Sequence, residues 1–127
     1  MRVYVDSDIL IWHLRGERRA ANLFRRLSQE RGTELWTGAL QRAEVVFFLR
    51  PSEMPATMSF LSRFKTEPVT QEVVDDAAEM YRKWHPSCGM DVNDAILAAT
   101  VAATGGKLYT LNVKHYRMPD IVVEKGW

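Results

Sequence analysis

The sequence contains a single cysteine, Cys88, among its 127 residues. An internal disulfide is therefore impossible, and a cysteine-based zinc site cannot be built. The longest run without a charged residue extends from Ala95 to Gly106, which is too short for a membrane-spanning helix of about 20 residues. The first residues of the chain also lack the apolar stretch of a signal peptide. These absences predict a cytoplasmic protein with no membrane anchor.

The sequence also lacks an excess of charge of either sign. The 17 lysines and arginines nearly balance the 16 aspartates and glutamates, which leaves a net charge of +1. This balance argues against a protein that binds nucleic acid through bulk positive charge, although it allows a local basic face beside an acidic pocket. Because a chain of 127 residues has room for one sizeable core, we expect residues 1–127 to form a single domain.

Short β-like runs alternate with helical patterns along the chain. Strands are predicted at 2–5, 34–37, 67–69, 107–110 and 121–123. The third of these is weak because it contains Pro68. Helices are predicted at 9–14, 17–31, 39–49, 53–64, 71–84 and 91–104, and His85 before Pro86 marks the end of the fifth. This alternation favours an α/β fold with a mainly parallel sheet, whose functional sites form at the carboxyl ends of the strands.

Two carboxylates, Asp6 and Asp8, directly follow the first predicted strand. Either Ser7 or Asp8 can cap the helix that is predicted to begin at Ile9, and this accounts for Asp8 without any chemistry. Capping does not account for Asp6, because an acid at the end of an apolar strand is costly unless it has a partner. We therefore interpret Asp6 as a functional residue.

Three further acids belong to predicted helices. Glu44 has Leu40 and Phe48 one turn away on either side, which predicts a place on an apolar flank, although an edge glutamate lying over the surface is common. Asp91 and Asp94 open the most apolar helix, where Asp91 is a natural N-cap and Asp94 benefits from the helix dipole. Asp94 should face the interior end of this helix and suits a divalent cation. For Asp91, a cap and a ligand remain equal alternatives.

Thr110 and Asn112 follow the fourth predicted strand. Asn112 is by default a turn residue, but its side-chain oxygen can also serve a metal ion or its water. His115 can approach the same place, although no two histidines have metal-ligand spacing and we assign it no catalytic role. Oxygen ligands without cysteine favour Mg²⁺ or Mn²⁺, which can activate a water and contact substrate phosphates.

Four segments, taken in order, resemble PIN-domain ribonucleases and especially their VapC-type toxins. The segments are Val3–Ile11, Arg42–Val45, Asn93–Thr100, and Leu108–Asn112 with the nearby His115-Tyr116. Ser7 and Asp8 replace the threonine and asparagine that are usual in the family. The resemblance implies a three-layer PIN fold and a Mg²⁺- or Mn²⁺-dependent endoribonuclease in which Asp6, Glu44 and Asp94 bind the metal.

Asn112 departs from the family pattern, because many relatives have a fourth acid at its place. The number of metal ions is therefore open, and one hypothesis is that Asp91 or Asp8 supplies the missing charge. In the mechanism that the resemblance implies, the cation activates a water that hydrolyses an RNA phosphodiester. Asn112 would position that water or the outer coordination shell, with Asp8 and Thr110 as secondary members of the site.

The resemblance further implies a small antitoxin that covers the active site, and a homodimer. The candidate contact residues are Trp12, Met54, Met58 and Phe60. Core packing is the better interpretation of Phe60. Arg15, Arg18 and Arg25 are candidates for binding RNA phosphates, because arginine binds phosphate bidentately, although a solvated helix face explains them equally well.

Two other functions compete with this interpretation. The triplet Asp6-Ser7-Asp8 also matches the strand-end Asp-x-Asp of haloacid-dehalogenase-like phosphatases, which form a covalent aspartyl phosphate. The chain is short for that fold, and no downstream lysine with paired acids matches it. The second alternative is a catalytically impaired PIN domain that binds RNA or protein without cutting, which the neutral Asn112 keeps open.

Overall fold

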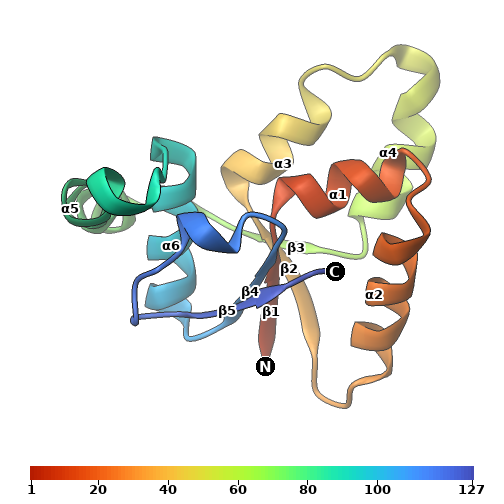
Figure 1. The fold of residues 1–127 in the computed structure, drawn as a ribbon. Coiled ribbons are helices and arrows are strands. Elements are labelled where there is room, and N and C mark those ends of the chain that lie inside the picture. Colours follow the sequence, from red (N-terminus) through yellow and green to blue (C-terminus); the bar gives the residue numbers. More distant parts are fainter.

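A five-stranded sheet forms the middle layer of the protein, and the computed structural model describes all of residues 1–127 (Figure 1). The strands are β1 (Arg2–Val5), β2 (Glu34–Gly38), β3 (Lys65–Glu67), β4 (Lys107–Thr110) and β5 (Val122–Lys125). Their spatial order is β3-β2-β1-β4-β5, and every neighbouring pair is parallel. The mainly parallel sheet predicted from the sequence is thus entirely parallel, with β1 at its centre.

Helices cover both faces of the sheet, as parallel pairing requires. They are α1 (Ser7–Leu14), α2 (Arg18–Gln29), α3 (Ala39–Val46), α4 (Met54–Leu61), α5 (Gln71–Cys88) and α6 (Val92–Thr104), with short 3₁₀ turns at η1 (Pro51–Glu53) and η2 (Val113–His115). Figure 1 shows α5 and α6 on one side of the sheet and α1, α2 and α4 on the other. This is the predicted three-layer arrangement. None of the helices combines the length and the apolar character needed to cross a membrane.

Alternation of side chains along β1 divides the core into two clusters of 13 buried residues each. Val3 and Val5 point toward the layer of α1, α2 and α4, whereas Tyr4 points toward α5 and α6. All three side chains are fully buried, so these β1 residues form a continuous apolar run and do not alternate between apolar and polar residues. The first polar residue after this run, Asp6, therefore emerges at the carboxyl edge of the sheet centre.

The predicted starts of α1 and β3 were wrong. α1 begins at Ser7 instead of Ile9, because the carboxylate of Asp6 accepts the amide of Ser7 at 2.8 Å and acts as the N-cap. Capping thus belongs to Asp6 and not to Ser7 or Asp8. β3 comprises Lys65–Glu67 instead of 67–69, and Pro68, which has no amide hydrogen for the ladder, follows the strand.

The predicted end of α5 was also wrong, because the helix continues through Pro86 to Cys88. Cys88 is buried in the core, and Nδ1 of His85 lies 2.7 Å from the carbonyl oxygen of Met90. These contacts of the last turn outweigh the amide hydrogen that proline lacks. Gly89 then ends the helix with a φ of 71°, a left-handed conformation that favours glycine.

Several other elements differ from the prediction by a few residues at their ends. The three helices predicted at 17–31, 39–49 and 53–64 are shorter, and the last strand extends to Lys125. α3 ends at Val46 because Phe47 and Phe48, which follow it, are 76% and 87% exposed and make no core contact that would extend the helix.

His13 of α1 is expected to make the stability of the fold sensitive to acid. Its ring stacks on Phe60 with centroids 4.3 Å apart, and its buried Nδ1 has no hydrogen-bond partner. Burial, with a smaller contribution from the positive charge of Arg63, lowers the pKa of His13 from 6.5. Because the folded state disfavours the charged ring, the free energy of unfolding should decrease as the pH falls below the unfolded value and until the folded pKa is passed.

The measurement is thermal unfolding of the wild type and a His13→Phe variant between about pH 7.5 and pH 5. We expect the wild type to lose more stability than the variant over this range. Equal losses in both proteins would show that His13 carries no cost of protonation.

Candidate active site

A cavity of about 290 Å³ opens at the carboxyl edge of β1 and β4. Its lining residues are Asp6, Ser7, Asp8, Ile11, Glu44, Asp91, Asn93, Asp94, Asn112 and His115. Five of these ten are carboxylates, and none is a lysine or an arginine. We call these five acids the acidic cluster. The structure therefore brings together acids from three segments of the chain, at the edge where parallel sheets hold their sites.

Asp6 is the buried centre of the acidic cluster, with 6% of its surface exposed. Oδ1 accepts the amide of Ser7, and Oδ2 accepts the hydroxyl of Thr110 at 2.9 Å and that of Tyr116 at 3.0 Å. Burial, followed by the charge of Asp8, raises the pKa of Asp6 to about 7 despite these hydrogen bonds. The site thus disfavours a negative charge at Asp6 and favours a positive charge beside it. Thr110 lies beneath the cavity and does not line it.

Tyr116 bridges Asp6 and Asp94, two acids of the cluster that come from different segments of the chain. Its hydroxyl lies 3.0 Å from Oδ2 of Asp6 and 2.9 Å from Oδ1 of Asp94. Burial and the charges of both acids raise the pKa of Tyr116, so its hydroxyl stays protonated. One hydroxyl carries one hydrogen and cannot donate to both carboxylates at once. The second contact is favourable when an acid carries a proton, in agreement with the raised pKa of Asp6.

Sequence reasoning missed the role of Tyr116, which is 4% exposed. The residue was noted only as part of the closing turn, and no spacing rule connects it with acids more than 20 positions earlier in the chain. Asp94 also lies 3.2 Å from Nδ1 of His115, so the predicted approach of this histidine to the site is observed.

Asp8 lies in the first turn of α1 and joins that helix to the turn after β4. Oδ1 accepts the amide of Ile9 at 2.7 Å, and Oδ2 accepts the amide of Leu111 at 3.0 Å. The side-chain amide of Asn112 donates to the same Oδ2 at 3.5 Å. Burial raises the pKa of Asp8 as well, so a second acid of the cluster carries its charge at a cost.

Glu44 does not occupy the apolar flank that the sequence predicted. It is exposed to the cavity, because its neighbour Phe48 points into solvent and forms no packed surface around it. Oε2 accepts the hydroxyl of Ser7 at 2.9 Å, and Oε1 accepts the side-chain amide of Asn93 at 3.4 Å. The structure therefore places Glu44 on the open side of the acidic cluster, opposite the buried Asp6.

Asp91 has the first of the two roles that the sequence left open, the cap of α6, while its role as a ligand stays a prediction. Its Oδ1 accepts the amide of Asp94 at 2.7 Å, while Oδ2 of Asp94 accepts the amide of Asp91 at 3.1 Å, which forms a reciprocal capping box at the start of α6. Asp91 also lines the cavity. The cap explains why both acids stand at this helix start and fixes the direction of their carboxylates.

The donor set suits a hard cation, although no three of these side chains are already arranged to hold an ion by themselves. The carboxylate oxygens are directed toward hydroxyls and amides instead. Mg²⁺ commonly keeps several waters and binds through one or two carboxylates, so it does not require three direct protein ligands. Carboxylates and an amide without thiols are the donors that Mg²⁺ and Mn²⁺ prefer. The residues present therefore fit such an ion.

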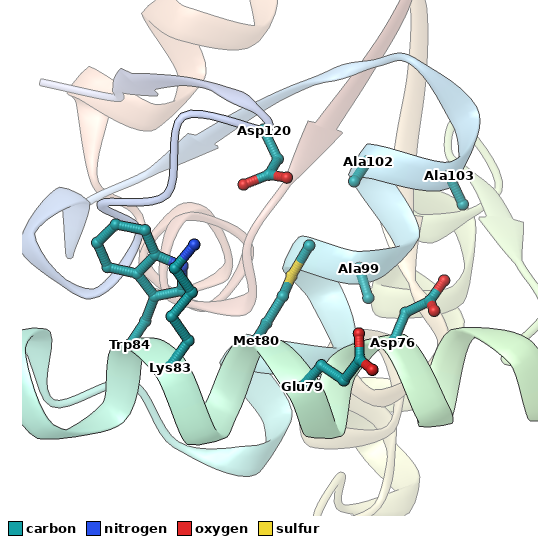
Figure 2. A pocket seen from close by; sticks show the side chains of 9 residues that line it. All are labelled: Asp76, Glu79, Met80, Lys83, Trp84, Ala99, Ala102, Ala103 and Asp120. Atoms are coloured by element: carbon teal, nitrogen blue, oxygen red, sulfur yellow. The ribbon is translucent and has the colours of Figure 1, made fainter.

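A larger cavity of about 410 Å³ lies between α5, α6 and the loop before β5 (Figure 2). It has an alanine floor, and Asp76, Glu79 and Asp120 stand around it as exposed side chains. Lys83 is among them, with its amine 5.5 Å from the ring of Trp84. Because a positive charge is present and the acids are solvated, this cavity lacks the concentrated charge of the acidic cluster.

The candidate surface residues are distributed over the molecule. Trp12 and Met54 are exposed, Met58 is half-buried against the core, and Phe60 is buried, as its core interpretation predicts. Arg15, Arg18 and Arg25 are exposed and do not line the cavity of the acidic cluster. Arg25 instead donates to Oδ1 of Asn22 at 3.2 Å.

Residues 3–121 match the family model described as the PIN domain. The ribonuclease VapC19 of Mycobacterium tuberculosis is 34% identical over 119 residues, which cover 92% of this chain and 94% of the relative. The structure of VapBC-1 from nontypeable Haemophilus influenzae superposes with a TM-score of 0.81 at 18% identity, covering 99% of this chain and 98% of that one. A toxin–antitoxin complex from Klebsiella pneumoniae gives 0.79 at 20% identity, with 98% of both chains covered. At such low identity these structures show the fold.

Proposed function

Because the chain belongs to the PIN-domain family, we propose that it is a Mg²⁺- or Mn²⁺-dependent endoribonuclease and the toxin of a type II toxin–antitoxin pair. The acidic cluster carries this proposal, since five carboxylates line one cavity that has no lysine or arginine in its lining. RNA phosphates are negatively charged and would be repelled by such a surface unless a cation lay between them. The curated relative named above is a ribonuclease, which agrees with this chemistry.

Asp6, Glu44 and Asp94 are the residues that would hold the cation. When bound, a divalent cation lowers the pKa of a coordinated water and stabilises the charge that develops at the phosphorus during displacement. The other residues of the chain orient these three carboxylates. The hydroxyls of the buried Thr110 and Tyr116 contact Oδ2 of Asp6, and their hydrogens can rotate as the charge in the cavity changes.

Three neighbouring side chains orient the other two acids. Ser7 and Asn93 donate to the two oxygens of Glu44, and His115 contacts Oδ2 of Asp94. Such contacts to metal-ligating residues fix their direction and support their affinity for the ion. The site is thereby built largely on helices and strand ends, which position side chains more precisely than loops do.

The neutral Asn112 makes Asp8 the residue that would supply the missing charge, because Asp8 contacts the side chain of Asn112 directly. We expect Asp8→Asn to raise the Mg²⁺ concentration for half-maximal RNA cleavage about tenfold. Asp91→Asn should change it less than about twofold, since Asp91 is exposed and its carboxylate is engaged as a cap. Magnesium titrations of both variants test this. A larger effect of Asp91→Asn would assign the missing charge to Asp91.

Exposed aromatic residues support the antitoxin partner. Phe47 and Phe48 follow α3 and stand largely in solvent, and Trp12 and Met54 are exposed on α1 and α4 of the same sheet face. Uncovered apolar side chains of this kind are typical of a surface that a partner protein covers. An antitoxin segment bound there would lie next to α3 and Glu44. A homodimer stays a prediction, which light scattering of the purified chain measures.

The experiment that tests the function is digestion of RNA by the purified protein with Mg²⁺, Mn²⁺ or EDTA. We expect cleavage with either metal and none with EDTA. Cleavage that persists in EDTA would contradict the proposed mechanism. Binding of RNA without cleavage in either metal would favour the impaired PIN domain that Asn112 keeps open. Membership of the PIN family leaves the phosphatase alternative without support.

A further inference from the structure

A third cavity, near the end of the chain, has the chemistry of a nucleotide site. From its geometry we propose that Arg19, Arg26 and Trp127 form a subsite that holds one unpaired nucleotide of a single-stranded RNA substrate, beside the bond that is cut. The inference rests on the proposed ribonuclease function and adds the strandedness of the substrate and the residues that hold it. We call these three residues the Arg-Trp subsite.

The three residues of the Arg-Trp subsite border a cavity of about 280 Å³ between α2 and the segment after β5. Its lining residues are Arg19, Asn22, Leu23, Arg26, Gly126 and Trp127. Arg19 and Arg26 stand two helical turns apart on one face of α2. The guanidinium carbon of Arg19 lies 5.5 Å from the centroid of the Trp127 ring. Two cations and one aromatic face thus border the same space.

The charges of the Arg-Trp subsite are only partly neutralised. Arg26 forms no ion pair, and Arg19 contacts Glu17 through Nε alone, at 2.6 Å. The terminal nitrogens of both guanidinium groups are left as donors, and a phosphate accepts such donors in pairs. Trp127 packs against the core on one side and is only half-buried, so part of its ring can contact a base. Phosphate contacts beside an aromatic platform are the features by which proteins bind single-stranded nucleic acid.

The Arg-Trp subsite is joined directly to the acidic cluster by β4 and β5. The amide of Gly126 donates to the carbonyl of Thr110 at 3.1 Å, and the hydroxyl of Thr110 donates to Asp6. β1 and β5 are separated by two strand spacings, about 10 Å, because only β4 lies between them. In Figure 1 the carboxyl-terminal segment leaves β5 toward α2, on the face that carries α1. One strand of RNA can therefore contact both places.

The backbone of Gly126 lies close to Ile9, and this contact fixes the position of the carboxyl-terminal segment. A side chain at this position would meet Cδ1 of Ile9 at 2.8 Å, so the segment before Trp127 lies against Ile9 of α1. The Arg-Trp subsite also differs from the arginines that the sequence suggested. Arg18 and Arg25 precede Arg19 and Arg26 by one position each and do not line the cavity.

The test compares matched variants in cleavage and binding of a single-stranded oligoribonucleotide. We expect the double variant Arg19→Ala/Arg26→Ala, and separately Trp127→Ala, to raise KM about 5- to 20-fold with kcat within twofold of wild type. Arg18→Ala/Arg25→Ala removes the same charge from the same helix and should raise KM less than about twofold. A second measurement is the slope of the logarithm of the RNA-binding constant against the logarithm of the salt concentration, taken in EDTA. This slope should be shallower by about 1.4 in Arg19→Ala/Arg26→Ala than in wild type, because two phosphate contacts are lost. Misfolding would not reproduce this change.

Several outcomes distinguish this subsite from the proposed function. If wild type cuts RNA and all variants share its KM, the Arg-Trp subsite is wrong and the ribonuclease stands. If the control pair has the larger effect, the RNA path runs over the other face of α2. If Trp127→Ala weakens binding to a blunt duplex as much as to a single strand, the proposed stacking of an unpaired base on Trp127 is wrong. Wild type that neither binds nor cuts RNA with Mg²⁺ or Mn²⁺ overturns both proposals.

Discussion

An Asp6→Asn variant should cleave RNA at least about 10³-fold more slowly than wild type at saturating Mg²⁺, a loss of about 4 kcal/mol of transition-state stabilisation. Asp6 is the most buried acid of the cluster and is linked by hydrogen bonds to β4, α1 and Tyr116. Asparagine retains its size and one acceptor oxygen but carries no charge to attract the cation. The measurement is kcat over a range of Mg²⁺ concentrations.

The same substitution should leave the metal-free fold intact or stabilise it. Burial makes a negative charge at Asp6 costly, and the asparagine oxygen can still accept the amide of Ser7 as an N-cap. In EDTA we therefore expect the variant to unfold at the same temperature as wild type or a few degrees above it. Asp76→Asn, at an exposed acid of the larger cavity, is the matched control and should alter neither quantity. A lower unfolding temperature in Asp6→Asn with activity within tenfold of wild type would reduce Asp6 to a structural cap.

Much of the acidic cluster could be predicted from sequence because the sheet topology does most of the positioning. A parallel α/β sheet brings the residues after β1 and β4 to one edge, so Asp6, Asp8 and Asn112 are placed by strand order alone. Asp94 required only the observation that an apolar helix begins beside it. These positions depend on local patterns, which a single sequence contains.

The contacts that could not be predicted depend on long-range geometry. Tyr116 reaches Asp6 across 110 positions of sequence, and nothing in the turn around it indicates which way its ring points. Likewise, the arginines of α2 occur as two adjacent pairs, and only the position of the segment after β5 separates Arg19 and Arg26 from their neighbours. Helix ends were mispredicted for a related reason, since burial of Cys88 extends α5 past a proline.

The net charge of +1 acquires a physical meaning from these positions. Negative charge is gathered in the acidic cluster, and positive charge is gathered on α2, where the helix holds four arginines and two of them border the Arg-Trp subsite. A sum near zero thus combines an acidic region at the carboxyl edge of the sheet with a basic region on α2. Binding of RNA should therefore depend on the divalent cation as well as on monovalent salt.

The second large effect is expected from Tyr116→Phe, which removes a single hydroxyl from between Asp6 and Asp94. The two carboxylates then lose the hydroxyl that contacts both of them, and their relative positions are no longer fixed by a shared partner. Contacts of this kind to metal-ligating residues contribute about 10- to 100-fold to metal affinity. We expect kcat/KM at low Mg²⁺ to fall by that factor, while kcat at saturating Mg²⁺ recovers to within a few-fold of wild type.

Rescue by Mg²⁺ separates a positioning role of Tyr116 from a purely structural one. Loss of a buried hydrogen bond alone would lower the free energy of unfolding by about 1–3 kcal/mol and would leave the Mg²⁺ dependence of the folded enzyme unchanged. Tyr109→Phe is the matched control, because Tyr109 is buried on β4 to a similar degree and its hydroxyl contacts no acid. If both variants have the same Mg²⁺ requirement as wild type, Tyr116 does not position the acids. If Tyr116→Phe stays inactive at all Mg²⁺ concentrations, the hydroxyl acts in the chemical step itself.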